Sequence, residues 1–281
     1  MANLIYEITD AALTENADYQ YNMSLVLSSD ACSFLVHNAE KLLAFRYFTF
    51  QKRDLFDITD AFYEVLRQEK LLSLSFQKVN IAIAHKEFTF VPDELFDANR
   101  METYLQTVVS PPINDLIQMD NLNTDHAKNI YTLNSVLKNT LRTQYPSAAI
   151  QHIMSSTINA LSIYVENVAE STNRLFIHIR DQSLQFTCFK QNKFIFANYF
   201  EYQSSADIAY YMMLVINQLG IKQDDVRIIL SGQIERKSEI FNTLYRYVQK
   251  IEFLEYASPY HVPESFDTIP RHVFFDVLTI L

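Results

Sequence analysis

Glycine is the residue that this sequence most clearly lacks. Only two glycines occur in 281 residues, where the average usage of about 7% would supply roughly twenty. Phosphate-binding loops, dinucleotide-binding turns and nucleophile elbows need glycine because it lets the backbone come close to a ligand. The motifs GxGxxG, GxxxxGK(S/T) and GxSxG are all absent. The sequence therefore carries no signature of a dinucleotide-binding protein, a P-loop NTPase or an α/β-hydrolase.

Cysteine and positive charge are also scarce. The two cysteines, Cys32 and Cys188, lie far apart and form no CxxC pattern, and the seven histidines show no HxH or HExxH spacing. These patterns predict neither a disulfide framework nor a metal site, and they favour a reducing compartment. The net charge of −10 repels phosphate backbones and anionic lipid, so we expect no nucleic-acid partner.

The first 15 residues differ from a signal peptide, because they lack a basic n-region and reach Glu7 and Asp10 early. No segment is apolar for long enough to span a bilayer. We therefore expect a cytoplasmic protein without a membrane span.

Two segments, about 150 residues apart, repeat one pattern of three short strands. The first covers 23–30, 32–36 and 41–51, and the second covers 174–181, 184–189 and 193–203. Aromatic and β-branched residues between polar breaks are typical of strands joined by turns. Asp30 and Asp181 take matching places at the first bend of each segment.

Each three-strand segment is followed by a helix, an apolar strand and a second helix. The apolar strands are predicted at 79–83 and 226–230, and the second helices at 93–107 and 236–248. Ser204 to Asp207 has a capping-box pattern, and Gly220 suits the end of that helix.

The first half continues with a loop at 110–129, a strand at 129–133, a helix to 144, a strand at 149–153 and a helix at 157–168. The second half ends with a strand at 251–254 and a helix opened by Pro270. A short polar stretch at 169–173 separates the halves, which predicts subdomains at 1–170 and 171–281.

This duplicated layout resembles the actin-like ATPase (RNase H-like) fold of actin, the Hsp70 ATPase domain, sugar kinases and the FtsA and PilM proteins. The strand at 226–232, VRIILSG, resembles the adenosine motif of that superfamily. The whole chain also resembles an uncharacterised bacterial family with an actin-like fold. The resemblance covers 20–281 and implies an α/β protein. It would be a tandem pair of actin-like subdomains, each a mixed sheet with an antiparallel three-strand meander and crossover helices.

The resemblance also implies a phosphate-binding pattern that this chain does not keep. In the actin-like superfamily, each meander opens with Asp-x-Gly, whose carboxylate handles the metal while the glycine lets backbone amides reach the phosphates. Alignment by the strands places Val26 and Ser28 there in the first half, and His178 and Arg180 in the second. Side chains thus occupy positions that a triphosphate needs as bare backbone. We expect no nucleotide hydrolysis, no catalytic residues, no cofactor and no metal.

Four residues are candidates for a residual nucleotide- or anion-binding site: Asp30, Asp181, Arg180 and Gly232. Each also has a structural explanation. Aspartate is common in tight turns because its carboxylate bonds the backbone, and a strand-to-helix turn needs a residue that tolerates positive φ. An isolated arginine on a strand usually faces solvent.

The sequence therefore favours a non-catalytic scaffold or protein-interaction module with an unidentified protein partner. Its many aromatic residues suit protein interfaces, and an exposed edge of a third strand is a possible docking place for a peptide. The alternative is a nucleotide-binding protein or ATPase with non-standard phosphate loops that uses Asp30, Asp181 and Gly232. A nuclease of RNase H type needs three or four clustered carboxylates, which neither meander supplies. The partner and the oligomeric state stay open.

Overall fold

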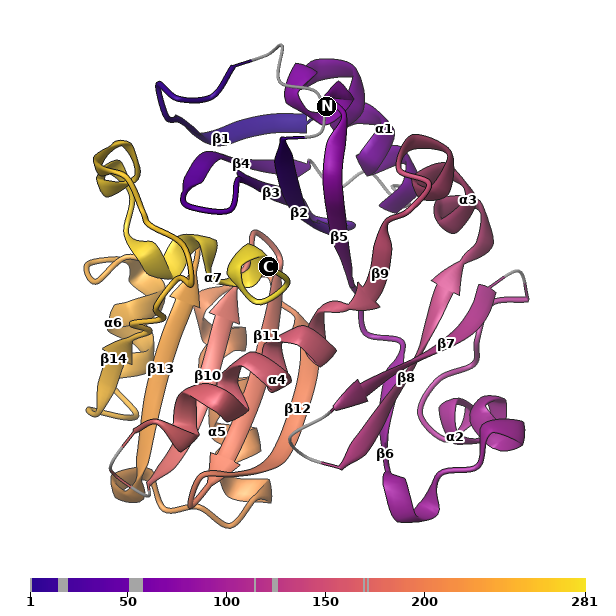
Figure 1. Ribbon diagram of the computed structural model, residues 1–281. Coiled ribbons are helices and arrows are strands. Elements are labelled where there is room, and N and C mark those ends of the chain that lie inside the picture. The colour runs from indigo at the N-terminus through magenta and orange to yellow at the C-terminus, as the bar shows by residue number, and fades with distance from the viewer. Residues whose placement is uncertain are drawn as a thin grey trace. The chain divides into compact units, whose positions relative to one another are not determined.

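The computed structural model describes residues 2–14, 20–50, 58–113, 115–122, 126–168, 170 and 172–281. The chain forms two compact α/β units (Figure 1). Unit 1 comprises Met1–Asn159, Ser258–Ile269 and Asp276–Leu281, and unit 2 comprises Ala160–Ala257 and Pro270–Phe275. Within the described stretches, every helix is too short or too polar to cross a lipid bilayer.

The main sheet of unit 1 has six strands in the order β1-β4-β3-β2-β5-β9. They are β1 (Ala2–Thr9), β2 (Tyr21–Ser28), β3 (Ala31–His37), β4 (Leu42–Phe50), β5 (Phe76–Ala84) and β9 (Ala149–His152). The first three predicted strands are β2, β3 and β4, which form an antiparallel meander. β5 runs parallel to β2, and β9 runs parallel to β5.

The sequence does not predict β1, which pairs with β4 from Ala2 opposite Phe50 to Thr9 opposite Ala44. The outer edge of β4 is therefore already occupied by the chain's own N-terminal strand. In unit 1, this pairing removes the open third-strand edge that the sequence offered to a partner peptide.

Helices pack around the main sheet of unit 1. α1 (Ile58–Gln68) contacts β2 and β3, and the 3-10 helix η1 (Lys70–Ser73) follows it. α3 (Ser135–Gln144) begins at Asn134, whose side chain accepts hydrogen bonds from the amides of Val136 and Leu137. This cap satisfies two of the amides that a helix leaves unpaired at its start. The division between the units falls inside α4 (Ile153–Glu166).

A small antiparallel sheet in unit 1 has the order β6-β8-β7 and corrects part of the sequence prediction. Its strands are β6 (Phe88–Pro92), β7 (Asp115–Leu122) and β8 (Ala127–Asn134). β7 lies where a loop was predicted at 110–129. The helix predicted at 93–107 is instead two 3-10 turns, η2 (Asp93–Leu95) and η3 (Ala98–Arg100), followed by the short α2 (Met101–Gln106). α2 covers one face of this sheet around the buried residues Val91, Leu105 and Ile130.

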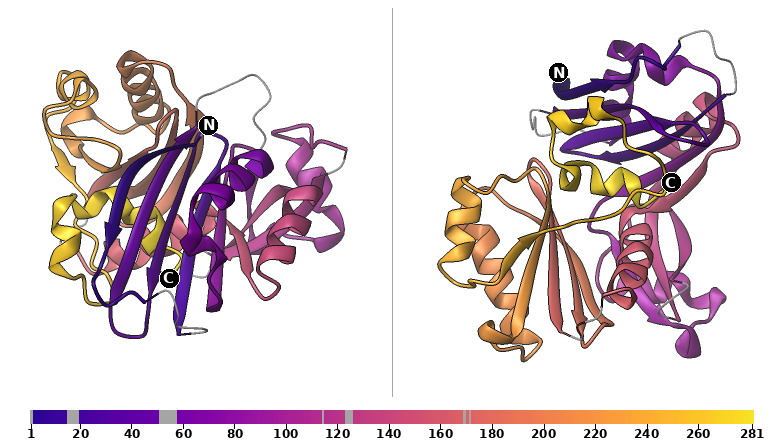
Figure 2. Two further views of the ribbon diagram at one scale, coloured as in Figure 1. Left: turned by 90° about the horizontal axis from the view of Figure 1, so that it is seen from above. Right: turned by 60° about the vertical axis from the view of Figure 1, so that its left-hand side comes forward.

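The C-terminal stretches of the chain return to unit 1, as the yellow ribbon beside the indigo strands shows (Figure 2). The amide of Leu42 donates to the carbonyl of His261 (3.0 Å), and Nδ2 of Asn80 donates to the carbonyl of Ile280 (2.6 Å). The 3-10 helix η5 (Glu264–Thr268) and most of the short α7 (Phe275–Leu278) lie in these stretches, whereas the 3-10 helix η6 (Arg271–Phe274) lies in unit 2. The predicted division assigns all of 171–281 to the second half, whereas these hydrogen bonds place Ser258–Ile269 and Asp276–Leu281 with the first sheet.

The sheet of unit 2 has five strands in the order β12-β11-β10-β13-β14. They are β10 (Asn173–Ile179), β11 (Ser183–Lys190), β12 (Lys193–Glu201), β13 (Val226–Gly232) and β14 (Ile251–Phe253). The first three form the second predicted meander, and β13 and β14 run parallel to β10. This order and these directions match β4-β3-β2-β5-β9 of unit 1.

The helices α5 (Ser205–Gln218) and α6 (Glu239–Tyr245) pack on one apolar face of the unit 2 sheet, and the 3-10 turn η4 (Gln223–Asp225) precedes β13. The predicted capping box is confirmed, because Ser204 accepts from the amide of Asp207 and the Asp207 carboxylate accepts from the amide of Ser204. Gly220 follows α5 with a φ of +62°, as the sequence predicts.

Arg46 of β4 is the polar anchor that holds β1 in place. Its side chain is 95% buried, since only 5% of the residue is exposed. Nη1 donates to the carbonyl of Ile8 (2.6 Å), and Nη2 donates to Oγ1 of Thr9 (2.9 Å). Nε pairs with Glu69 (3.1 Å), which is 12% exposed, and Nη2 pairs with Glu7 (3.1 Å).

We expect Arg46→Ala to lower the free energy of unfolding by about 3–5 kcal/mol, because it leaves the nearly buried Glu69 carboxylate without a cation. Arg227 also pairs with two carboxylates, Glu170 and Glu252, but these side chains are 34–61% exposed. Arg227→Ala should therefore cost about 1 kcal/mol or less. Urea denaturation of both variants tests the comparison, and equal losses would contradict the role given to Arg46.

Candidate functional site

The first hairpin of unit 1, between β2 and β3, is closed by its own side chains. Ser28 is fully buried, and its Oγ accepts a hydrogen bond from the amide of Ala31 (3.0 Å). The hydroxyl proton lies within reach of both Oδ1 of Asp30 and the carbonyl of Ala31, and it serves one of them at a time. Asp30 is itself 7% exposed, and its carbonyl accepts from the amide of Phe50 (2.9 Å).

Ser28 occupies the position where the actin-like pattern has glycine. The hydroxyl of this serine accepts the hydrogen bond of the Ala31 amide. The Asp30 carboxylate lies beside the same hydroxyl, inside the turn.

The second hairpin, between β10 and β11, is closed by backbone bonds. The amide of Arg180 donates to the carbonyl of Ser183 (2.9 Å), and the hydroxyl of Tyr202 donates to the carbonyl of Arg180 (2.8 Å). Asp181 is exposed, and its Oδ2 accepts from Nε2 of Gln182 (3.3 Å). Arg180 has 0% exposure, so its side chain does not face solvent as an isolated basic residue on a strand usually does.

Gly232 ends β13 with a φ of +82°, opposite Ile179 of β10. A Cβ at this position would lie 2.1 Å from the carbonyl oxygen of Ile179. The next amide, that of Gln233, donates to the same oxygen (2.7 Å). The close backbone approach that this glycine permits is thus made to the neighbouring strand.

The structure brings three of the four predicted site residues together. Arg180 and Asp181 follow β10 directly, and Gly232 pairs with the last residue of β10 in the parallel register. Asp30 belongs to unit 1 and lies in the hairpin described above.

A buried polar row in unit 2 is absent from the sequence prediction. It consists of Tyr199, Gln185, His178 and Ser231, which lie opposite one another on β12, β11, β10 and β13. All four are at most 7% exposed, and Nδ1 of His178 lies 3.0 Å from Oγ of Ser231. Among the described residues, neither amide atom of Gln185 has a hydrogen-bond partner. The signal in the sequence is a single polar residue within an apolar run, such as His178 between Ile177 and Ile179.

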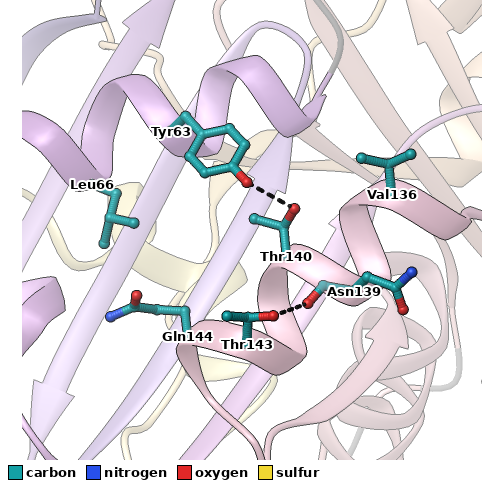
Figure 3. Close-up of a pocket in the computed structure, with 7 residues that line it drawn as sticks. All are labelled: Tyr63, Leu66, Val136, Asn139, Thr140, Thr143 and Gln144. Atoms are coloured by element: carbon teal, nitrogen blue, oxygen red, sulfur yellow. Dashed lines mark hydrogen bonds between the residues drawn. The ribbon is translucent and has the colours of Figure 1, made fainter.

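Three surface cavities are lined by described residues, and none of these linings includes a residue of either hairpin turn. One of about 300 Å³ lies between α1 and α3, where the hydroxyl of Tyr63 bonds Oγ1 of Thr140 at 3.2 Å (Figure 3). Its described lining is uncharged, and Tyr63 and Val136 are 41% and 59% exposed there. A second, of about 500 Å³ in unit 2, is lined by 253–257, Arg271 and His272. A third, of about 270 Å³ in unit 1, lies between the end of β5 and the start of α3.

Titratable side chains gather beside the third cavity. Nδ1 of His85 pairs with Oε2 of Glu87 (3.0 Å), and this hydrogen bond lowers the pKa of Glu87. Behind it, burial lowers the pKa of His152 well below 6.5, so that its ring is neutral at pH 7. Asp120 accepts from the amide of His152 (2.8 Å) and from the hydroxyl of Tyr131 (3.2 Å), while burial raises the pKa of its carboxyl group. Within the described ranges, no three His, Cys, Asp or Glu side chains are arranged to hold a metal ion.

Comparison with solved structures establishes the class of fold. A Bacteroides thetaiotaomicron protein with an actin-like ATPase fold and unknown function is 22% identical, with a TM-score of 0.78 over 96% of this chain and 99% of that one. A chain of the PilM-PilN type IV pilus biogenesis complex is 10% identical, with a TM-score of 0.65 over 92% of this chain and 97% of that one. The predicted actin-like fold is therefore confirmed.

The family follows from the sequence itself. The model of the family described as "Protein of unknown function (DUF3822)" matches residues 10–251, and the chain belongs to that family. Among curated proteins, none matches this chain.

The two glycines of the chain provide a matched test of the β10–β13 contact. No atom lies within 4 Å of a Cβ built on Gly220, so Gly220→Ala should cost about 1–2 kcal/mol from its left-handed backbone alone. Gly232→Ala adds the overlap with Ile179 and should destabilise the protein more, or prevent folding. Thermal and urea unfolding measure both variants, and similar stabilities would contradict the geometry at Gly232.

Ser28→Ala tests the closed hairpin. We expect a loss of about 1–3 kcal/mol in the free energy of unfolding, because the Ala31 amide and the Asp30 carboxylate each lose a buried partner. Ser29→Ala changes the exposed neighbour in the same turn and should stay within about 0.5 kcal/mol of wild type. A Ser28→Ala protein as stable as Ser29→Ala would show that the hydroxyl does not close the turn.

Proposed function

We propose that this chain is a non-catalytic scaffold or protein-interaction module built on a degenerate actin-like ATPase fold. The observation that carries the proposal is the closed hairpin at Ser28, where a side-chain hydroxyl holds the amide of Ala31. In a phosphate-binding turn, the backbone amides point at the phosphate and donate to it. To bind here, it would have to displace a buried hydroxyl that also bonds the Asp30 carboxylate.

The second hairpin supports the same proposal. Alignment by the strands places Arg180 at the glycine of Asp-x-Gly in the second meander, and its side chain is completely buried. At Gly232, the remaining glycine near this turn, the Ile179 carbonyl occupies the place of a Cβ, so the fold itself explains the glycine.

Similarity to a component of the PilM-PilN complex supports an interaction role, since a chain of this fold there takes part in a protein assembly. We also propose that the matching strand orders of the two sheets reflect an internal duplication.

The buried thiols support the proposed cytoplasmic location. Cys32 and Cys188 are both buried and form no disulfide within the described structure, and burial raises the pKa of Cys188 to about 12. Thiols kept reduced in this way are typical of a reducing compartment.

A thermal unfolding series with ATP and Mg²⁺ tests the proposal against the alternative of a nucleotide-binding protein or ATPase. We expect an unchanged Tm and no phosphate release at any nucleotide concentration. A ligand present at 100 times its Kd stabilises the folded state by about 2.7 kcal/mol, which would raise Tm by several degrees. Mg²⁺ alone and ATP with EDTA are the controls.

A Tm that rises saturably with MgATP, but not with either control, would contradict the proposal and favour the alternative. Phosphate release abolished by Asp30→Asn or Asp181→Asn would further assign the chemistry to the hairpins.

A further inference from the structure

The cavity between the end of β5 and the start of α3 joins an apolar wall to two carboxylates. Ile58, Ile83, Leu133 and Leu137 line its apolar side, and Glu87 and Asp115 line its polar side. All of these residues belong to unit 1, so the cavity is formed within one compact body.

The volume of about 270 Å³ limits what this cavity can take. Sites for cofactors and drug-sized ligands occupy about 300–1,000 Å³. The cavity lies just below that range and is open to solvent. It therefore suits a single long side chain better than a nucleotide.

The polar side of the cavity is acidic. No Lys or Arg is among its described lining residues, and the nearest partner of Glu87 is His85. That pair uses Oε2 of Glu87, and the Glu87 side chain is 28% exposed. The hydrogen bond from His85 keeps the pKa of Glu87 low, so the carboxylate is charged at pH 7.

The carboxylates are held in place by the surrounding backbone. The Glu87 amide donates to Nδ1 of His85 (3.1 Å), and the Glu87 carbonyl accepts from the amide of Thr132 (3.2 Å). Oδ1 of Asp115 accepts from Nδ2 of Asn134 (3.1 Å), and the other side-chain atom of Asn134 caps α3. Fixed carboxylates lose little freedom when a cation binds, which favours binding.

We propose that this cavity is a docking site for a long basic side chain, arginine or lysine, of a protein partner. The alkyl stem would lie along Ile83 and Leu137, and the cationic head would reach Glu87 and Asp115. Long basic side chains combine an apolar stem with a charged tip in this way. The net charge of −10 attracts basic partners over a longer range. The inference rests on the proposed interaction function and names the chemistry of the partner.

Methyl NMR of the full chain tests the site with n-butylguanidinium, which carries the stem and head of arginine, and with n-butylammonium for lysine. We expect saturable shifts confined to the methyl groups of Ile58, Ile83, Leu133 and Leu137. The neutral analogue n-butylurea and the anion butyrate are the ligand controls. Equal shifts with n-butylurea, saturable binding of butyrate, or no saturable shift with either cation would overturn the proposal.

Two variants assign the charge. Glu87→Gln should weaken n-butylguanidinium at least about tenfold, since it removes a charge-assisted hydrogen bond. Glu94→Gln removes an exposed carboxylate outside the cavity and should leave the affinity unchanged. If the NMR spectrum shows that Glu87→Gln does not fold, Asp115→Asn takes its place in the test. We expect this variant also to bind n-butylguanidinium at least about tenfold more weakly. Unchanged affinity in the folded variant overturns the site. None of these readouts depends on MgATP, so failure here and failure of the proposed function remain distinguishable.

Discussion

A backbone amide in a tight turn donates to one strong acceptor at a time. In the turn after β2, that acceptor is a side chain of the turn itself. Oγ of Ser28 accepts from the amide of Ala31 at 3.0 Å in a fully buried setting. In the Asp-x-Gly pattern of actin-like ATPases, a glycine takes the position at which this chain has Ser28. In this protein, the Ser28 hydroxyl and the Ala31 amide make the turn a self-contained structural element.

Each of the two glycines of the chain has a structural reason. Gly220 ends α5 in the left-handed region with nothing near its Cα, as a helix terminus commonly requires. Gly232 is needed for a different reason, since the carbonyl of Ile179 lies where a side chain would begin. Both glycines are explained by the fold. The proposed docking cavity beside Glu87 accordingly relies on side chains for its chemistry.

Much of this fold could be predicted from local sequence signals. The meander strands, the parallel strands β5 and β13 and the capping box at Ser204 all depend on apolar runs and cap chemistry within a few residues. Three strands were missed, β1, β6 and β7, and each lies at an edge of its sheet. The helix predicted at 93–107 breaks because the side chain of Asp97 accepts from the amide of Asn99 and starts a new turn.

The candidate sites were harder to predict, because they depend on register and on distant contacts. The polar row of unit 2 exists only because β10, β11, β12 and β13 align Gln185 with His178 and Tyr199. The return of the C-terminus to unit 1 rests on hydrogen bonds such as that from Asn80 to Ile280, 200 residues apart. The sequence identified four candidate site residues, Asp30, Asp181, Arg180 and Gly232. It did not reveal that the side chain of Arg180 is buried.

The amide of Ala31 reports most directly on whether the Ser28 hydroxyl closes the first hairpin. Its ¹H–¹⁵N resonance can be followed for hydrogen exchange and for chemical shift during a titration with MgATP. We expect this amide to exchange slowly and to keep its chemical shift at every nucleotide concentration, because it donates a hydrogen bond to Oγ of Ser28. A chemical shift that changes saturably with MgATP would show that a phosphate reaches the turn. It would contradict the claim that Ser28 closes this hairpin to nucleotide.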